Sequence, residues 1–149
     1  MASRRIDDLH PLLAYAFGLA LGEWRIRYPD RPQPILTATY RSPAEQDRLF
    51  RQPSDRIDND GDGRIDEPDE RVTAARAGES PHNFLPALAF DVAFQTADRK
   101  LDWSPRNFSD FAQLVLKSGG ITWGGNFRTL PDAPHFELTG WKTFAKIGI

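Results

Sequence analysis

The sequence predicts an α+β fold in which a small sheet carries helices packed on one face. Three observations support this prediction. An amphipathic helical pattern occupies the amino-terminal part, short β-prone apolar runs are spread along the rest, and further helix signals lie between those runs. Because 149 residues fit one domain and show no internal repeat, we expect a single domain over residues 1–149.

The first part of the chain predicts a helix, a strand and a second helix. Apolar residues recur at three- and four-residue steps across residues 8–28, a spacing typical of an amphipathic helix. Residues 35–40 form a β-prone run. Ser42 as N-cap, a proline in the first turn and Glu45 at the capping-box position together predict a helix over residues 43–50.

The second part of the chain predicts three strands and one helix. Residues 87–94 are typical of a buried strand, and residues 121–123 and 136–138 are short strand candidates. Between them, Ser104 and the proline after it predict the start of a helix, which is expected to end at Gly119. The mixed order of strands and helices is what favours the α+β class.

Residues 52–81 show no core pattern, and a segment of this length in a compact domain is uncommon unless it is disordered or functional. Residues 58–66 match the first nine positions of an EF-hand-type calcium loop. The expected calcium ligands are Asp58, Asp60, Asp62, Arg64 through its backbone carbonyl, Asp66 and Asp69. Glu70 is an alternative closing ligand, and the alternative for the whole loop is a solvated acidic turn. We hypothesise that calcium orders this insertion and positions the residues that follow it.

Composition excludes several classes of function. The formal net charge of −2 argues against a general attraction to nucleic acid. No apolar run approaches the roughly 18 to 20 residues that span a bilayer, and the basic start leads into an amphipathic stretch instead of a signal-peptide core. We therefore expect a protein made in the cytoplasm without membrane insertion. Because the chain has no cysteine, any transition metal must be held by histidine and carboxylate.

Three residues have the types and setting of a catalytic zinc site. His82 follows the long insertion, Asp91 interrupts an apolar strand, and His135 opens a strand after a proline-rich turn. A charged aspartate in an apolar strand is costly to bury unless a cation or several donors meet it. Two imidazoles and one carboxylate are a common zinc set that leaves a fourth position for water. Taken alone, however, the spacing favours hydrogen-bonded structural roles. His10, at a helix start, is expected at the surface and not as a further ligand.

Three ordered motifs resemble the M15 family of zinc peptidases. They are Ser80-Pro81-His82 leading to Ala89-Phe90-Asp91, then Asp132-Ala133-Pro134-His135-Phe136-Glu137, and upstream Ala38-Thr39-Tyr40-Arg41-Ser42 with Glu45-Gln46. In the first motif the turn that joins histidine to aspartate is two residues longer than in the family. The resemblance implies a small, mainly antiparallel sheet with helices packed on it, the hedgehog-like fold of these zinc peptidases. It also implies hydrolysis of peptide bonds in bacterial peptidoglycan.

The resemblance assigns roles to individual residues. The zinc ligands that it implies are His82, Asp91 and His135. Asp132 corresponds to the general base, and Arg41 to a residue that stabilises a substrate carboxylate or the developing oxyanion. Glu137 is the rival base or an orienting neighbour of a ligand. The other residues that we expect near the ligands or the substrate are Ser80, Gln46 and Trp123, although a core position is favoured for the tryptophan.

Members of this family include D-alanyl-D-alanine carboxypeptidases and dipeptidases, and the L-alanyl-D-glutamate endopeptidases used as phage endolysins. A chain without a leader resembles the endolysins more than the exported carboxypeptidases. We therefore expect a monomeric endolysin that is made in the host cytoplasm and reaches the wall after the membrane is permeabilised. The alternatives are a D-alanyl-D-alanine carboxypeptidase or dipeptidase, and a non-catalytic module that binds the cell wall in a calcium-dependent manner.

Overall fold

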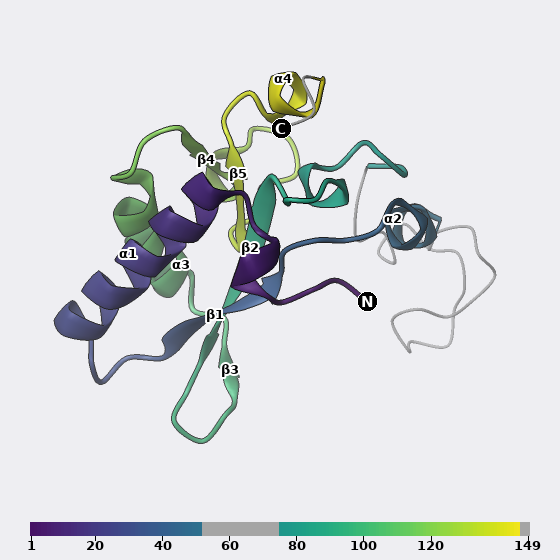
Figure 1. The fold of residues 1–149 in the computed structure, drawn as a ribbon. Helices are drawn as coiled ribbons and strands as arrows, with labels where there is room; N and C mark the ends of the chain where they lie inside the picture. Colours follow the sequence, from purple (N-terminus) through teal and green to yellow (C-terminus); the bar gives the residue numbers. More distant parts are fainter. Residues whose placement is uncertain (52–74, 147–149) are drawn as a thin grey trace, which may run out of the picture.

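The structure is a computed structural model, and it describes residues 1–51 and 75–146. Its elements, in chain order, are the short 3-10 helix η1 (Ile6–Asp8), α1 (Pro11–Arg27), β1 (Gln33–Ala38), α2 (Pro43–Phe50), the 3-10 helix η4 (Pro81–Asn83), β2 (Ala89–Gln95), β3 (Leu101–Asp102), α3 (Pro105–Leu116), β4 (Ile121–Trp123), the 3-10 helix η5 (Gly124–Asn126), β5 (His135–Leu138) and α4 (Trp141–Lys146). The sheet has the strand order β1-β2-β5-β4, with β3 paired to β2, and these pairings are antiparallel (Figure 1). The predicted α+β fold is confirmed.

Helices α1 and α3 lie on one side of the sheet, whereas α2 lies on the other (Figure 1). Aromatic rings join the helical layer to the sheet. Phe90 of β2 stacks on Phe136 of β5 with 5.1 Å between ring centroids, and Phe17 of α1 meets Phe90 edge-on at 5.6 Å. Phe111 of α3 contacts Phe136 at 6.1 Å. Because burial of one such side chain contributes about 1.5–3 kcal/mol, this cluster is a main source of stability.

Strands β2 and β5 present an apolar and a polar face, because successive side chains of a strand point to opposite sides. Phe90 and Phe136 are fully buried on the helical side. Asp91 and His135 are the next residues in register, directly opposite each other on neighbouring strands. The polar groups of the two central strands therefore gather on the face that α1 and α3 leave uncovered.

The predicted boundaries of the first strand and the second helix can be compared with the structure. Helix α2 covers Pro43–Phe50 as predicted, and the Ser42 hydroxyl accepts a hydrogen bond from the Glu45 N–H at 3.1 Å. Strand β1 begins and ends two residues earlier than predicted. Its end differs because Thr39 and Tyr40 leave β2 and exchange backbone hydrogen bonds with Ser3, each 2.7 Å long.

Two local predictions are wrong. His10 is buried, since Leu9 bridges to Ala87 and the imidazole Nδ1 accepts a hydrogen bond from the Leu12 N–H at 3.2 Å. Ser104 precedes α3 as predicted but makes no side-chain cap, because its hydroxyl donates to Asp102 at 2.6 Å instead. In both places a contact formed by the tertiary fold replaces the local one.

Elements β3 and α4 were not predicted. Strand β3 is two residues long, too short to show a period, and α4 starts after Gly140 near the end of the described residues. Within residues 1–51 and 75–146, none of the helices is both long enough and apolar enough to cross a bilayer.

Candidate metal centre

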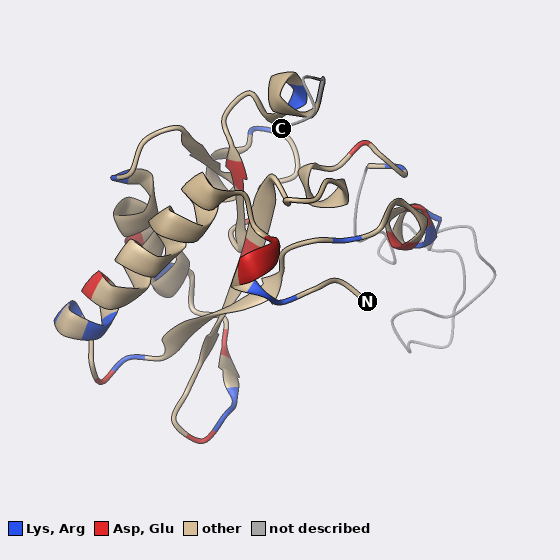
Figure 2. Ribbon diagram, in the orientation of Figure 1, with Lys and Arg blue, Asp and Glu red and all other residues tan. Residues whose placement is uncertain are grey.

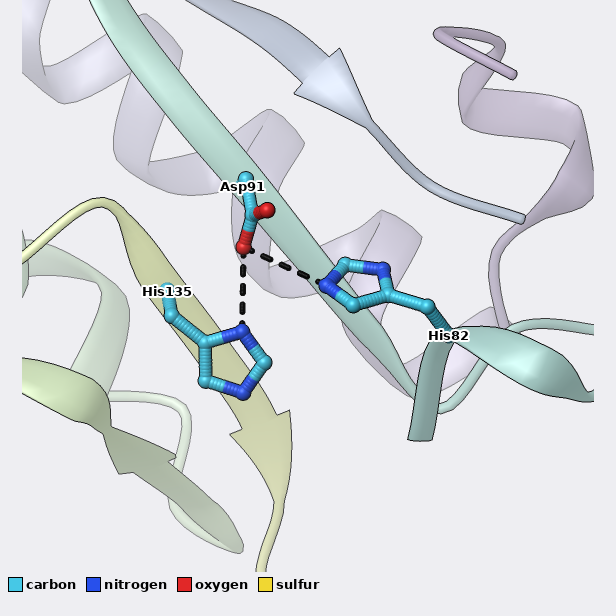
Figure 3. A group of neighbouring side chains, drawn as sticks. All are labelled: His82, Asp91 and His135. Carbon is cyan, nitrogen blue, oxygen red and sulfur yellow. Dashed lines mark hydrogen bonds and ion pairs between the residues drawn. The ribbon is translucent and has the colours of Figure 1, made fainter. Parts of the chain in front are cut away.

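Three predicted ligands meet on the polar face of the sheet. The ligand atoms of His82, Asp91 and His135 all lie within 4.8 Å of one another. Asp91 comes from β2, His135 from the start of β5 and His82 from η4, and Figure 3 shows their side chains pointing toward a common point. The structure thus brings together the set that sequence spacing alone did not favour, even though the first histidine and the aspartate are nine positions apart in the chain.

His82 is held by the backbone around it. The Ser80 hydroxyl caps η4 by accepting from the His82 N–H at 3.2 Å. The His82 carbonyl accepts from the Arg41 N–H at 2.8 Å, and the Asn83 side chain donates to the Arg41 carbonyl at 3.0 Å. These bonds join η4 to the segment that follows β1. They fix the first histidine against the sheet despite the longer turn that follows it.

The backbone carbonyl of Thr39 determines which nitrogen of the His82 ring carries the proton. Its Nδ1 lies 2.8 Å from the Thr39 carbonyl oxygen, and because a carbonyl can only accept, Nδ1 is the donor. In the neutral ring Nε2 is then a lone-pair acceptor, yet it faces Asp91 Oδ1 at 3.3 Å. Two acceptors face each other there, so a cation or an added proton must lie between them.

His135 repeats this arrangement with its nitrogens exchanged. Its Nε2 lies 2.8 Å from Glu137 Oε1, which accepts, and its Nδ1 lies 3.0 Å from Asp91 Oδ1. The same carboxylate oxygen of Asp91 therefore faces a lone-pair position on both rings (Figure 3). Three lone-pair atoms that converge in this way, each ring oriented through its other nitrogen, are the donor set of a divalent metal site.

The close packing of these side chains shifts the pKa values of Asp91 and His135. Burial raises the pKa of Asp91, but the charge of His82 and the hydrogen bonds from both rings outweigh it and hold that pKa well below its usual range. Burial lowers the pKa of His135, but hydrogen bonds to Asp91 and Glu137 outweigh it and raise that pKa to about 10. Without a metal, a proton is therefore held strongly in the position that a cation would take.

Asp132 lies at the rim of the site, in the turn before β5. Although the residue as a whole is exposed, loss of hydration around its carboxylate raises its pKa, and the negative charge of Asp91 raises it further. The positive charges of His135, His82 and Arg41 oppose that rise. The charge of Asp132 thus interacts with those of all three candidate ligands. Its raised pKa suits a carboxylate that exchanges protons.

The turn that carries Asp132 depends on two close backbone approaches. The Asp132 N–H donates to the Gly124 carbonyl at 2.8 Å, and a Cβ on Gly124 would lie only 2.4 Å from the Asp132 carbonyl oxygen. The Trp123 indole N–H donates to the Ala133 carbonyl at 2.7 Å, while its ring packs against the core. Trp123 therefore occupies the favoured core position and also holds the turn.

Arg41 and Gln46 form a pair beside the site. The Arg41 guanidinium donates to the Gln46 side-chain oxygen at 3.0 Å, and the fully buried Gln46 donates to the Ala75 carbonyl at 2.8 Å. Gln46 therefore positions the arginine and does not contact the candidate ligands through these bonds. Because the partner in this bond is a neutral amide, the bond itself does not offset the positive charge of the guanidinium.

Part of the chain is similar to known peptidases. A sequence pattern of peptidase M15, described as D-alanyl-D-alanine carboxypeptidase, matches residues 73–138. The peptidoglycan L-alanyl-D-glutamate endopeptidase CwlK of Bacillus subtilis (strain 168) is 33% identical over 112 residues, which are 70% of this chain and 59% of CwlK. Residues 73–138 of this chain are thus similar to peptidase M15 proteins. The chain spans about three-fifths of the length of CwlK.

Solved structures share the M15 fold of this chain. The L-Ala D-Glu endopeptidase ChiX of Serratia marcescens aligns with a TM-score of 0.61 at 23% identity, covering 100% of this chain and 93% of ChiX. The D,D-pentapeptidase VanY, solved as a mutant in complex with Zn(II), aligns at 0.59 and 13% identity over 93% of this chain and 77% of its own. The LD-carboxypeptidase LdcB aligns at 0.61 and 16% identity over 98% and 67%. These likenesses show the M15 fold.

The predicted calcium loop lies outside the described residues. Its expected ligands are Asp58, Asp60, Asp62, Arg64, Asp66 and Asp69, all within residues 52–74. Calcium binding therefore stays a prediction, and calorimetric titration with millimolar calcium would test it. The monomeric state also stays a prediction.

Two residues that shape this site were not predicted from the sequence. Thr39 supplies the carbonyl that orients His82, and Asn83 locks η4 to the segment after β1. A signal for Asn83 was present, because Ser80 and Asn83 have the spacing of a capping box, and both halves of that box form. Nothing in the sequence indicates the contact of Thr39, since it lies 43 positions before His82 in the chain.

Proposed function

We propose that this chain is a zinc-dependent peptidase that hydrolyses stem peptides of bacterial peptidoglycan at the L-alanyl-D-glutamate bond. The convergence of three lone-pair atoms from His82, Asp91 and His135 carries the proposal. The donor set contains two imidazoles and one carboxylate, which suits zinc and leaves a position open. The choice of bond is supported by CwlK, which is named for that bond and is 33% identical over 112 residues.

Each residue has a defined part in the reaction. Zinc bound by the three ligands would supply Lewis acidity toward a peptide carbonyl and lower the pKa of a water molecule. Asp132 accepts the proton of the attacking water at a carboxylate oxygen and returns it to the leaving amine. The Arg41 guanidinium, held by Gln46, offsets negative charge that develops on the carbonyl oxygen or lies on the substrate.

Glu137 has an orienting part. Its carboxylate is occupied by His135 Nε2 at 2.8 Å, so it holds the ring with Nδ1 facing the other ligands. Asp132 lies at the rim of the site, where desolvation and the charge of Asp91 raise the pKa of its carboxyl, a shift that favours proton exchange near neutral pH. We therefore assign the base to Asp132 and the orienting role to Glu137.

One digest tests the proposal. Purified peptidoglycan is incubated with the protein as isolated, with the protein after zinc chelation, and with the chelated protein after zinc is restored. Mass spectrometry of the products is expected to show internal cuts between L-Ala and D-Glu that chelation abolishes and zinc restores. Pull-down of the wall without hydrolysis would instead support the non-catalytic module.

A D-alanyl-D-alanine carboxypeptidase is the second candidate. The description of the matched family pattern favours it, as does the fold shared with VanY. The same digest separates the two activities, since this one releases terminal D-Ala and leaves the L-Ala to D-Glu bond intact. The role as an endolysin of a phage, and the route to the wall through a permeabilised membrane, remain parts of the proposal that lysis assays in host cells would test.

A further inference from the structure

A hollow of about 360 Å³ opens beside the candidate metal centre and reaches Asp91. It lies between the end of β1, helix α2 and the amino-terminal segment. Its lining residues are Met1, Ala2, Arg4, Thr37, Ala38, Arg41, Glu45, Arg48, Leu49 and Asp91. Ala38 pairs with Asp91 in the sheet, so the floor of the hollow is continuous with the polar face that carries the site.

The amino-terminal segment forms one wall of this hollow. The Ser3 N–H donates to the Tyr40 carbonyl and the Thr39 N–H donates to the Ser3 carbonyl, both at 2.7 Å. These two bonds hold the segment beside the connection from β1 to α2, and the two segments run side by side in Figure 1. The Ser3 hydroxyl turns to Asp8 at 2.6 Å, while the residues on either side of it line the hollow.

The three arginines that line the hollow differ in their hydrogen-bond and ion-pair partners. Arg48 makes two hydrogen bonds to the Glu45 carboxylate, at 3.0 and 2.6 Å. Arg41 donates to the neutral Gln46 side chain. Arg4 is exposed and makes no ion pair with any residue that the structure describes. Figure 2 shows basic positions on both segments that border the hollow. Within the described residues neither Arg4 nor Arg41 forms an ion pair with a carboxylate, although the charge of Arg41 acts on Asp132 and Glu45.

The chemistry of the proposed scissile bond supplies a matching anion. A glutamate that donates its nitrogen to the bond has two carboxyl groups, and the peptide can continue through only one of them. The other carboxylate stays free within a few bonds of the nitrogen that leaves. Guanidinium groups present several donors in a fixed fork, which suits a carboxylate.

We propose that the hollow binds the acidic residue on the amine side of the scissile bond, with Arg4 as a specificity-determining residue that receives its free carboxylate together with Arg41. The proposal rests on the proposed function. Arg4 acts on binding, so its loss raises KM more than it lowers kcat. The preference for an acidic residue also weakens at high salt, because the pair is partly exposed to solvent.

Two synthetic peptides test the proposal. They are identical except that the residue after L-Ala is D-Glu with a free carboxylate in one and its carboxamide in the other. The value of kcat/KM is measured for both with wild type, Arg4→Gln and Arg5→Gln. Arg5 is a matched control, because it is the next residue in the chain and pairs with Asp7 at 3.2 Å instead of lining the hollow.

Wild type is expected to prefer the free carboxylate, and Arg4→Gln to lose about five- to tenfold in kcat/KM on that peptide only. Arg5→Gln should keep the wild-type preference. An Arg4→Gln variant with the wild-type ratio between the two peptides would overturn this proposal and leave the proposed function standing. Hydrolysis of neither peptide by wild type would overturn the proposed function, and this proposal with it.

Discussion

Replacing Glu137 by glutamine separates the two roles considered for this acid. Glu137 Oε1 lies 2.8 Å from His135 Nε2, and its side chain is only 17% exposed. Glutamine can still accept this hydrogen bond through its amide oxygen, so the ring keeps its orientation and loses only the adjacent negative charge. Removal of such an orienting carboxylate costs about 10- to 100-fold in metal affinity, or about 1.4–2.7 kcal/mol.

The loss of zinc affinity should depend on pH in a defined direction. The pKa of His135 is raised to about 10, so below that pH zinc must displace a proton, and apparent affinity rises as pH rises. Without the Glu137 charge the ring holds its proton less strongly, which offsets part of the loss near pH 7. The deficit of Glu137→Gln is therefore expected to widen between about pH 7 and 9.5.

Competition against a chromophoric zinc chelator measures this deficit across the pH range. Glu23→Gln is the matched control, because it makes the same change on α1, where Glu23 pairs with Lys117 at 2.9 Å. Its zinc affinity should equal that of wild type. If Glu137→Gln bound zinc as wild type does at every pH but hydrolysed nothing, Glu137 would be the base and the orienting role would be wrong.

Three further predictions concern the base, the turn and the metal. Asp132→Asn should lower kcat by about 10²- to 10⁴-fold, while calorimetry shows that zinc affinity is retained. Because the pKa of Asp132 is raised, the activity of wild type should fall on acidification with a midpoint above the ordinary aspartate pKa. Gly124→Ala places a Cβ 2.4 Å from the Asp132 carbonyl oxygen, so urea unfolding should show a loss of about 1–3 kcal/mol, whereas Gly22→Ala, with open space on α1, should gain about 0.5–1 kcal/mol. Chelation of zinc should lower the melting temperature, since a ligand at 100 times its Kd stabilises by about 2.7 kcal/mol; an unchanged melting temperature would contradict zinc binding by the folded chain.

Local chemistry predicted those parts of the fold that depend on neighbours in sequence. The serine cap and first-turn proline predicted the bounds of α2, and the lone aspartate in an apolar strand predicted that Asp91 would face a partner. Parts that depend on distant segments were not predictable in this way. The burial of His10 follows from its docking beside Ala87, and no pattern near either residue encodes that contact.

The candidate site was also predicted only in part. The ligand types could be read from the sequence, and the family resemblance put them in order. Glu137 was expected as the rival base or as an orienting neighbour, and the structure gives it a hydrogen bond with His135. The orienting contact of Thr39 could not be read from the sequence, because it acts through a backbone carbonyl, which every residue has. Arg4 was missed for a related reason. An arginine near the start of the chain has no feature of its own, and only the docking of Ser3 beside Tyr40 places it in the wall of the hollow.

The register of the sheet is what makes the site, and the core sets that register. Asp91 and His135 are directly opposite each other, and so are their neighbours Phe90 and Phe136, whose rings stack at 5.1 Å on the other face. A slip of one residue would turn the histidine into the core and a phenylalanine toward solvent. The free energy of aromatic burial therefore opposes a one-residue slip, which would separate the carboxylate from the imidazole. Metal affinity in this chain should accordingly fall with core substitutions that loosen β5, even where no ligand is changed.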